Sequence, residues 1–121
     1  MSYVDGFVFA VPKKKVAEYK RIARKAGKVW MEHGALAYQE CLGEDIPKKK
    51  KGSVSFPGMV LAKPGELIGF SWIVYKSRAH RDKVLKKVLS DPRLAKMMNP
   101  DAMPFDMKRM AYGGFKTLVS F

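Results

Sequence analysis

The stretch at residues 75–82, YKSRAHRD, brings together serine, histidine and aspartate, which are the residue types of a hydrolytic triad. An apolar-periodic run follows, so the stretch starts a helix that we predict over residues 77–89. Ser77 suits the N-cap of that helix, and Asp82 stands early in it, where the helix dipole favours an acid. Ser77, His80 and Asp82 do not converge on one point, because helical side chains two positions apart face different ways. We therefore interpret the stretch as a helix start and not as a triad.

Arg81 is the residue of this stretch that the helix would direct inward. It falls near the centre of the apolar stripe of the helix, whereas His80 falls on the flank of that stripe. A buried charge needs a partner, because an unpaired one is costly. Three interpretations remain open: a structural ion pair with Glu40, Asp5 or Asp106, contact with an anionic ligand, or a side chain that reaches solvent along its aliphatic stem.

His33 lies on the apolar stripe of the preceding helix, in the last turn before Gly34. A histidine there can serve the C-terminal dipole and the free carbonyls of the helix, or act as a base in a pocket near neutral pH. The chain has two histidines and one cysteine, without a metal-ligand spacing. We therefore predict no metal site and no other cofactor.

Two aromatic residues are candidates for the walls of an apolar cavity. Trp72 belongs to the run LIGFSWIVY, and Tyr38 alternates with Leu36, Glu40 and Leu42 along ALAYQECL. Alternation places these four side chains on one strand face, so Tyr38 and Glu40 would lie side by side. The competing interpretation is that Trp72 and Tyr38 are ordinary core residues.

Strand and helix patterns alternate along the chain. Two amphipathic helices are predicted at 13–33 and 77–89, and Pro12 and Gly34 bound the first of them. One helical turn is expected at 92–98, and KPGE at 63–66 has the pattern of a type II turn. Strands are predicted at 3–11, 35–42, 54–62, 67–75 and 108–120, of which 54–62 is the weakest because Pro57 and Gly58 interrupt it. This order is that of an α+β, ferredoxin-like βαββαβ sandwich with an extra strand.

The strands at 3–11 and 67–75 are apolar on both faces. In a ferredoxin-like sandwich both helices cover one face of the sheet, so the second face also needs a cover. The simplest cover is another copy of the same chain in a two-fold homodimer.

Several long motifs are similar to those of the bacterial YbaA-like family of uncharacterised proteins. The resemblance spans nearly the whole chain and rests on YVDGFV, AGKVWMEHGAL, FSWIVYKSRAHRD, DPRL and MPFDMKRMAYGGF. It implies the dimeric α+β barrel superfamily, in which two ferredoxin-like protomers join their sheets. Relatives by fold include cofactor-independent monooxygenases, haem enzymes and proteins that bind small aromatic or polyketide-like ligands, which is fold analogy only.

The 121 residues fit one domain, 1–121, and the 24 basic against 11 acidic residues give a formal net charge of +13. The lone Cys41 excludes a disulfide within the chain, which fits a reducing cytoplasm. No apolar run approaches the roughly 18 residues of a membrane helix, so no membrane partner is expected.

Most cations fall on the outer faces of the two helices and in the loop at 48–51, without interleaved aromatics or a helix-turn-helix. We expect weak attraction to polyanions but no specific nucleic-acid binding.

The leading hypothesis is a cytoplasmic homodimer that takes up a small anionic or aromatic molecule, either as a binding protein or as a cofactor-independent oxygenase or isomerase-like enzyme. Its site would lie between helices and sheet, where Arg81 anchors the ligand, His33 or His80 moves protons, and Trp72 and Tyr38 form walls. One alternative is a basic protein that binds nucleic acid or another polyanion through its surface. The other is a regulatory dimer without a ligand.

Overall fold

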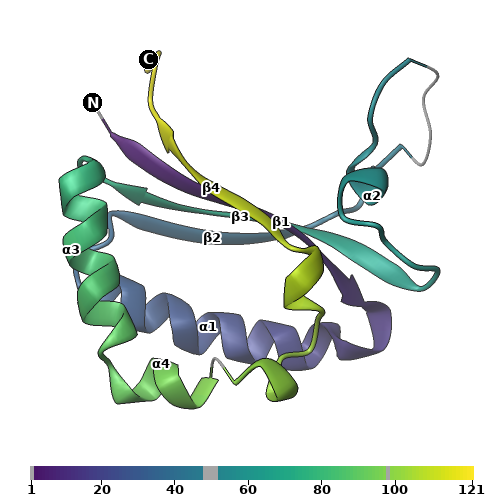
Figure 1. Ribbon diagram of the computed structural model, residues 1–121, viewed down its shortest axis with the longest axis horizontal. Coiled ribbons are helices and arrows are strands. Elements are labelled where there is room, and N and C mark those ends of the chain that lie inside the picture. The colour runs from purple at the N-terminus through teal and green to yellow at the C-terminus, as the bar shows by residue number, and fades with distance from the viewer. Residues whose placement is uncertain (1, 48–51, 98) are drawn as a thin grey trace.

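The computed structural model describes residues 2–47, 52–97 and 99–121, so the lysine run predicted as a loop at 48–51 lies outside the described part. The described chain forms a four-stranded antiparallel sheet in the order β2-β3-β1-β4. The strands are β1 (Tyr3–Pro12), β2 (Ala37–Leu42), β3 (Glu66–Tyr75) and β4 (Ala111–Lys116) (Figure 1). The two longest strands, β1 and β3, pair over their whole length in the centre.

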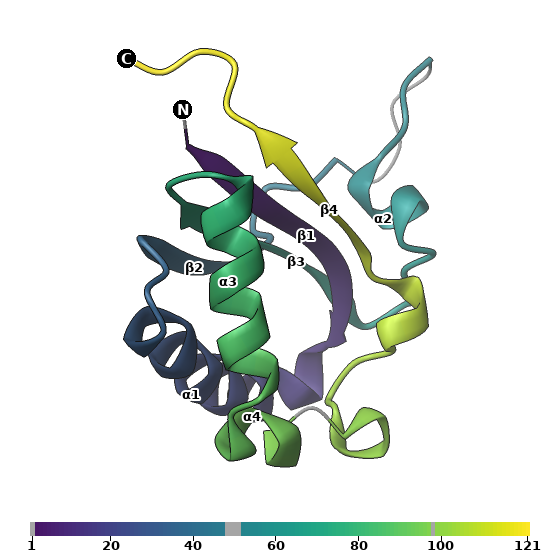
Figure 2. The same ribbon diagram turned by 60° about the vertical axis from the view of Figure 1, so that its left-hand side comes forward.

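The longer helices gather on one face of the sheet (Figure 1, Figure 2). The long helices are α1 (Val16–Glu32) and α3 (Arg78–Leu89), and the short α4 (Pro92–Met97) packs against both. Shorter elements are η1 (Lys13–Lys15), α2 (Phe56–Met59), η2 (Pro100–Ala102) and η3 (Met107–Arg109). No helix in the described ranges is long and apolar enough to cross a bilayer. The sequence order of strands and helices is that of a ferredoxin-like α+β fold, as predicted.

Local signals place the helix ends where the sequence predicts them. Pro12 closes β1, and α1 ends before Gly34, whose φ of +111° is a left-handed conformation that favours glycine. The Ser77 Oγ accepts a hydrogen bond from the His80 N–H at 3.1 Å and so caps α3. Gly65 has a φ of +82° and Glu66 N–H donates to the Lys63 carbonyl, which confirms the type II turn.

The prediction of an extra strand at 54–62 is wrong. Ser55 caps the short helix α2 there, because its Oγ accepts from the Gly58 N–H at 3.1 Å. Pro57 lies in the first turn of α2, where its missing N–H leaves no hydrogen bond unmade. The buried Val60 packs beside Ala10 against the sheet, so the segment contributes burial but no strand. The last strand is also shorter than predicted, because η3 occupies residues 107–109.

The main core lies between the sheet and the helices. Its buried residues come from α1, from the connection between α1 and β2, and from β3, α3 and α4. They are Ala26, Val29, Ala35, Ile73, Tyr75, Val84, Val88 and Leu94. A smaller cluster of Ala10, Val60 and Ile68 lies on the opposite side of the sheet, under α2. The sheet is thus apolar on both sides. The long helices cover one side, and the short α2 covers only part of the other.

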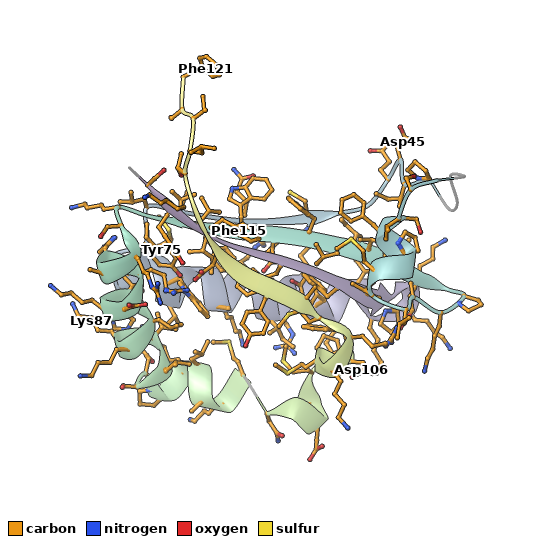
Figure 3. All side chains as sticks on the ribbon, turned by 45° about the horizontal axis from the view of Figure 1, so that its top comes forward. Asp45, Tyr75, Lys87, Asp106, Phe115 and Phe121 are labelled. Carbon is orange, nitrogen blue, oxygen red and sulfur yellow. The ribbon has the colours of Figure 1, made fainter. Side chains whose placement is uncertain are left out.

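The sheet face opposite α1 and α3, here called the outer face, remains largely open. Phe70 on β3 and Phe115 on β4 are 44% and 61% exposed. Figure 3 shows Phe115 on β4, the edge strand that crosses the front of this view. The other residues that line a hollow on this face are Val4, Gly6, Phe7, Val8, Met59, Trp72, Val74, Ala111, Tyr112 and Gly113.

Candidate functional site

The structure does not bring the six predicted site residues together. It distributes them over four places: Tyr38 with Glu40 on β2, Trp72 on β3, His33 at the end of α1, and His80 with Arg81 at the start of α3. Each place has its own set of contacts, which decide what the residues there can do.

Arg81 is held by carboxylates of the chain itself. Its Nη1 donates to Asp5 Oδ1 at 2.7 Å and its Nε donates to Asp82 Oδ1 at 2.8 Å. The guanidinium also lies 5.0 Å from the centre of the Tyr3 ring, in a cation–π arrangement. Of the three interpretations of Arg81, the structure therefore shows the ion pair, and its buried partner is Asp5, not Glu40 or Asp106.

Asp5 is the centre of a buried polar network on β1. It is 7% exposed and accepts hydrogen bonds from Arg81 and from the Tyr75 hydroxyl. Trp30 Nε1 in turn donates to the Tyr75 oxygen at 3.1 Å. Burial raises the pKa of Asp5, and the nearby Arg81 charge opposes that rise. The network thus joins β1, β3, α1 and α3.

Both histidines have local partners near helix ends. His33 Nε2 lies 2.9 Å from Asp91 Oδ2, and its backbone N–H donates to the Val29 carbonyl at the C-terminus of α1. His80 Nδ1 accepts from the Lys76 N–H at 2.9 Å. Neither histidine lines the pocket that contains Tyr38 and Glu40.

Trp72 lies on the outer face of the sheet. Its ring packs against Phe70 with centroids 5.6 Å apart, and it lines the hollow of that face. Tyr38 pairs with Ile73 and faces the helices, so Trp72 and Tyr38 lie on opposite sides of the sheet. They cannot be walls of one cavity within a single copy of the chain.

A pocket of about 620 Å³ lies between α1 and β2. Its walls are mainly apolar, and its polar side chains are two carboxylates, two phenols and three cations. The lining residues are Val16, Tyr19, Lys20, Ala23, Arg24, Gly27, Lys28, Met31, Glu32, Tyr38, Glu40, Cys41 and Leu42. Tyr38 and Glu40 are thus the two predicted site residues that the structure places in one pocket.

Glu40 is oriented by two tyrosine hydroxyls. Tyr38 donates to Oε1 at 2.9 Å, and Tyr19 donates to Oε2 from α1. Surrounding protein atoms raise the pKa of Glu40, and the two hydrogen bonds oppose this rise. Glu40 nevertheless keeps much of its surface accessible, because it faces the open pocket. Burial and the Glu40 charge raise the pKa of both tyrosines, so they remain protonated donors.

Small residues on α1 make room for this arrangement. A Cβ at Gly27 would lie 2.9 Å from Cδ1 of Tyr38, so the glycine allows the ring to lie against the helix. Ala23 lies one turn earlier, and Tyr19 another turn earlier, on the same pocket wall. Sequence reasoning missed Tyr19 and Gly27 as site residues. The sequence signal for them was the four-residue spacing of Tyr19, Ala23 and Gly27. This spacing puts a tyrosine and two small residues on one helix face, and the small residues leave space for a pocket beside the sheet.

The described residues contain no group of three or more histidine, cysteine or carboxylate side chains that could hold a metal ion. What the pocket offers is a base whose pKa is raised, two phenolic donors, mainly apolar walls and three cations of α1. Such a set suits the binding of a small molecule with a weakly acidic proton.

Residues 2–107 match a family described as a protein of unknown function (DUF1428). The chain belongs to the DUF1428 family. The chain is 44% identical over 119 residues to the uncharacterized protein YbaA of Escherichia coli K12, and the match covers 98% of each chain. The YbaA protein of Shigella flexneri matches to the same extent. The predicted resemblance to the YbaA-like family is therefore confirmed.

Two solved structures share the fold of this DUF1428 protein at low sequence identity. An uncharacterized NIPSNAP domain protein from Burkholderia xenovorans has a TM-score of 0.57 at 12% identity, with 96% of this chain and 94% of that chain covered. SnoaB, a cofactor-independent oxygenase from Streptomyces nogalater that was crystallised as a point mutant, has a TM-score of 0.59 at 10% identity, with 98% and 95% covered. Identities this low show the fold alone, and they confirm the ferredoxin-like α+β class.

Proposed function

We propose that this DUF1428 protein is a cytoplasmic homodimer that binds a small, largely apolar, weakly acidic molecule in the pocket between α1 and β2. The proposal is carried by one observation, the Glu40 carboxylate between the hydroxyls of Tyr19 and Tyr38 inside an apolar pocket. Arg81 is left out of this site, because Asp5 and Asp82 satisfy its charge. An exposed, unbridged Cys41 fits a reducing compartment.

Glu40 would act as the base toward the ligand. It would accept a proton from an acidic C–H or O–H bond, whose electron pair stays on the ligand as an enolate or phenolate. In an isomerase-like reaction, Glu40 would return the proton to a different carbon. In an oxygenase reaction, dioxygen would add to the carbanion and form a C–O bond, which oxidises the carbon by two electrons. The proton from Glu40 would then complete a hydroperoxide. The name of SnoaB, a cofactor-independent oxygenase, supports this second route by fold analogy only.

Titration with 2-naphthol tests the pocket, because this compound is an apolar weak acid whose fluorescence reports its own binding and ionisation. We expect saturable binding that Glu40→Gln weakens about tenfold, since a hydrogen bond to a charged acceptor is lost. Glu18→Gln is the matched control, because it removes one carboxylate from α1 outside the pocket. Equal weakening by both variants, or the absence of saturable binding, contradicts the proposed pocket and favours a regulatory dimer without a ligand.

The open outer face supports the homodimer. Phe70 and Phe115 are large, exposed and neighboured by further apolar side chains, whereas the long helices α1 and α3 cover the opposite face. An exposed apolar patch of this kind is typical of an interaction surface. Two copies that pack outer face against outer face would bury it with two-fold symmetry, and the pocket between α1 and β2 would stay on the other side of each sheet.

Replacing Phe115 by Glu should convert the dimer to a monomer, because a carboxylate would be buried without a partner in the interface. Sedimentation velocity at micromolar concentration measures this change. Leu89→Glu is the control: Leu89 is 62% exposed, close to the 61% of Phe115, but lies on α3. A monomeric unsubstituted protein, or equal dissociation of the Leu89→Glu variant, contradicts an interface on the outer face.

A further inference from the structure

Helix α1 carries a dense set of cations on the side turned away from the sheet. Five exposed basic residues surround the exposed Ala17 and line a shallow hollow of about 450 Å³. We call these five residues the basic ridge: Lys20, Arg21, Arg24, Lys25 and Lys28. In Figure 1, α1 runs below the strands, so the surface it turns away from them faces outward.

The charges of the basic ridge are not neutralised within the described part of the chain. The arginines that form salt bridges there are Arg81, Arg93 and Arg109, none of which belongs to the ridge. The acid at the end of α1, Glu32, is bound by Arg93 at 2.6 Å. The ridge also places like charges four residues apart, which destabilises an isolated helix. The ridge therefore contributes no ion pair to the fold, and its charges are free to bind a partner.

The shape and chemistry of the ridge fit the backbone of duplex DNA. Lys20 and Lys28 are eight residues apart, which is about 12 Å along a helix. Duplex DNA carries one negative charge per roughly 1.7 Å of its axis, so several phosphates face a ridge of this length. The ridge contains no aromatic side chain to stack on the bases of a single strand, and no apolar side chain to enter a lipid interface. Its residues are cations that suit phosphate contacts rather than a defined reading of bases.

We propose that the basic ridge of α1 binds the phosphate backbone of double-stranded DNA without reading its sequence. This interaction adjoins the proposed pocket between α1 and β2, because Lys20, Arg24 and Lys28 line both. Arg21 and Lys25 belong to the ridge alone. The interaction also remains compatible with the proposed dimer, because the ridge lies on the helix-covered side of the sheet and the interface on the other. A dimer would present two ridges to DNA.

Fluorescence anisotropy with a labelled duplex of about 20 base pairs, at about 50 to 200 mM salt, tests this proposal. We expect the unsubstituted protein to bind with a Kd of about 10⁻⁴ to 10⁻⁶ M at physiological salt, and equally to duplexes of unrelated sequence. The double variant R21E/K25E should bind at least about tenfold more weakly at about 100 mM salt. Its slope of log K against log salt should be smaller in magnitude by about 2, roughly 0.9 for each lost phosphate contact. Arg21 and Lys25 are chosen because neither lines the pocket between α1 and β2.

The matched control is K83E/K87E, which reverses two exposed lysines at the same spacing on α3. Lys87 points away from the body of the molecule (Figure 3). Both double variants change the net charge by the same amount, so we expect the control to keep its affinity within about twofold. Circular dichroism checks that both double variants are folded. R21Q/K25Q is a milder second variant, whose affinity should fall between that of the unsubstituted protein and that of R21E/K25E.

Three results would overturn the proposal. The first is an equal loss of affinity in K83E/K87E, which would mean that total charge and not the ridge determines binding. The second is no retention of the duplex by the unsubstituted protein at about 100 mM salt. The third is tighter binding to vesicles of anionic phospholipid than to DNA with the same dependence on Arg21 and Lys25, which would make the ridge a lipid-binding surface.

Discussion

Replacing Arg81 by Met should lower the free energy of unfolding by about 3 kcal/mol at neutral pH. The variant would leave Asp5, which is 7% exposed, as a buried carboxylate without its cation. The remaining hydrogen bond from Tyr75 offsets only part of that cost. Met keeps most of the aliphatic packing over Tyr3, so the change isolates the charge. Urea unfolding followed by circular dichroism gives the difference directly.

Two further substitutions show whether the buried pair causes this loss. Asp82→Asn removes the more exposed partner of Arg81 and should cost less than about 1 kcal/mol. Asp5→Asn in the Arg81→Met background should recover part of the stability, because the unpaired charge is then absent. If the double variant loses as much stability as the single variants Asp5→Asn and Arg81→Met lose when added together, Asp5 and Arg81 do not act as a pair.

The cost of losing Arg81 should also depend on pH. Burial raises the pKa of Asp5 above its unfolded value, and without Arg81 the pKa would rise further. Between the unfolded pKa and the raised folded pKa of Asp5, the folded state binds more protons than the unfolded state. The stability of the variant therefore falls as the pH rises through this range. The difference between the unsubstituted protein and the Arg81→Met variant should therefore shrink on acidification, as Asp5 becomes neutral. A difference that stays constant from about pH 7 to about pH 4 would contradict a charged Asp5.

Replacing Glu66 by Gln should cost about 2 kcal/mol at neutral pH, and this cost should also shrink on acidification, here because the folded pKa of Glu66 is lowered. Arg109 binds both carboxylate oxygens of Glu66, with Nη1 at 2.8 Å and Nη2 at 2.7 Å, and the Lys63 N–H donates to Oε1 at 2.6 Å. These bonds lower the pKa of Glu66 to about 2. A carboxyl whose pKa falls from 4.5 to that value contributes up to about 3 kcal/mol, which nearby solvent reduces.

The Glu66 contribution should be complete above its unfolded pKa and disappear under acid. Because the folded pKa is depressed, stability is present above about pH 4.5 and is lost as pH falls through about 2. Chemical unfolding between about pH 7 and about pH 3 measures the narrowing gap between the two proteins. Asp106→Asn is the control, since Asp106 is 45% exposed and binds the same Arg109 at 3.2 Å, and it should cost less than about 1 kcal/mol. A Glu66→Gln cost that is the same under acid as at neutral pH would mean that the carboxylate charge is not responsible.

Most elements could be predicted from the sequence because their signals are local. The strand-forming residues of 3–11 and 67–75 predict β1 and β3, and the apolar stripe of 13–33 predicts α1 after one 3₁₀ turn. The segment 54–62 is misassigned because a short apolar run does not by itself separate a strand from a short helix. Ser55 favours the helix because it caps the N-terminus, and Pro57 favours it because a proline fits the first helical turn. Both signals are weaker in a sequence than hydrophobic periodicity.

The sequence by itself determined that Tyr38 and Glu40 share a strand face and that Arg81 points inward, since both follow from the periodicity of one element. Only the tertiary structure decided that Tyr19 reaches Glu40 from α1 and that Asp5, among three possible carboxylates, holds Arg81. It also separated Trp72 from Tyr38 by the thickness of the sheet. The physical reason is that a repeat pattern specifies the face of a strand or helix, whereas contacts between elements depend on strand register and helix packing.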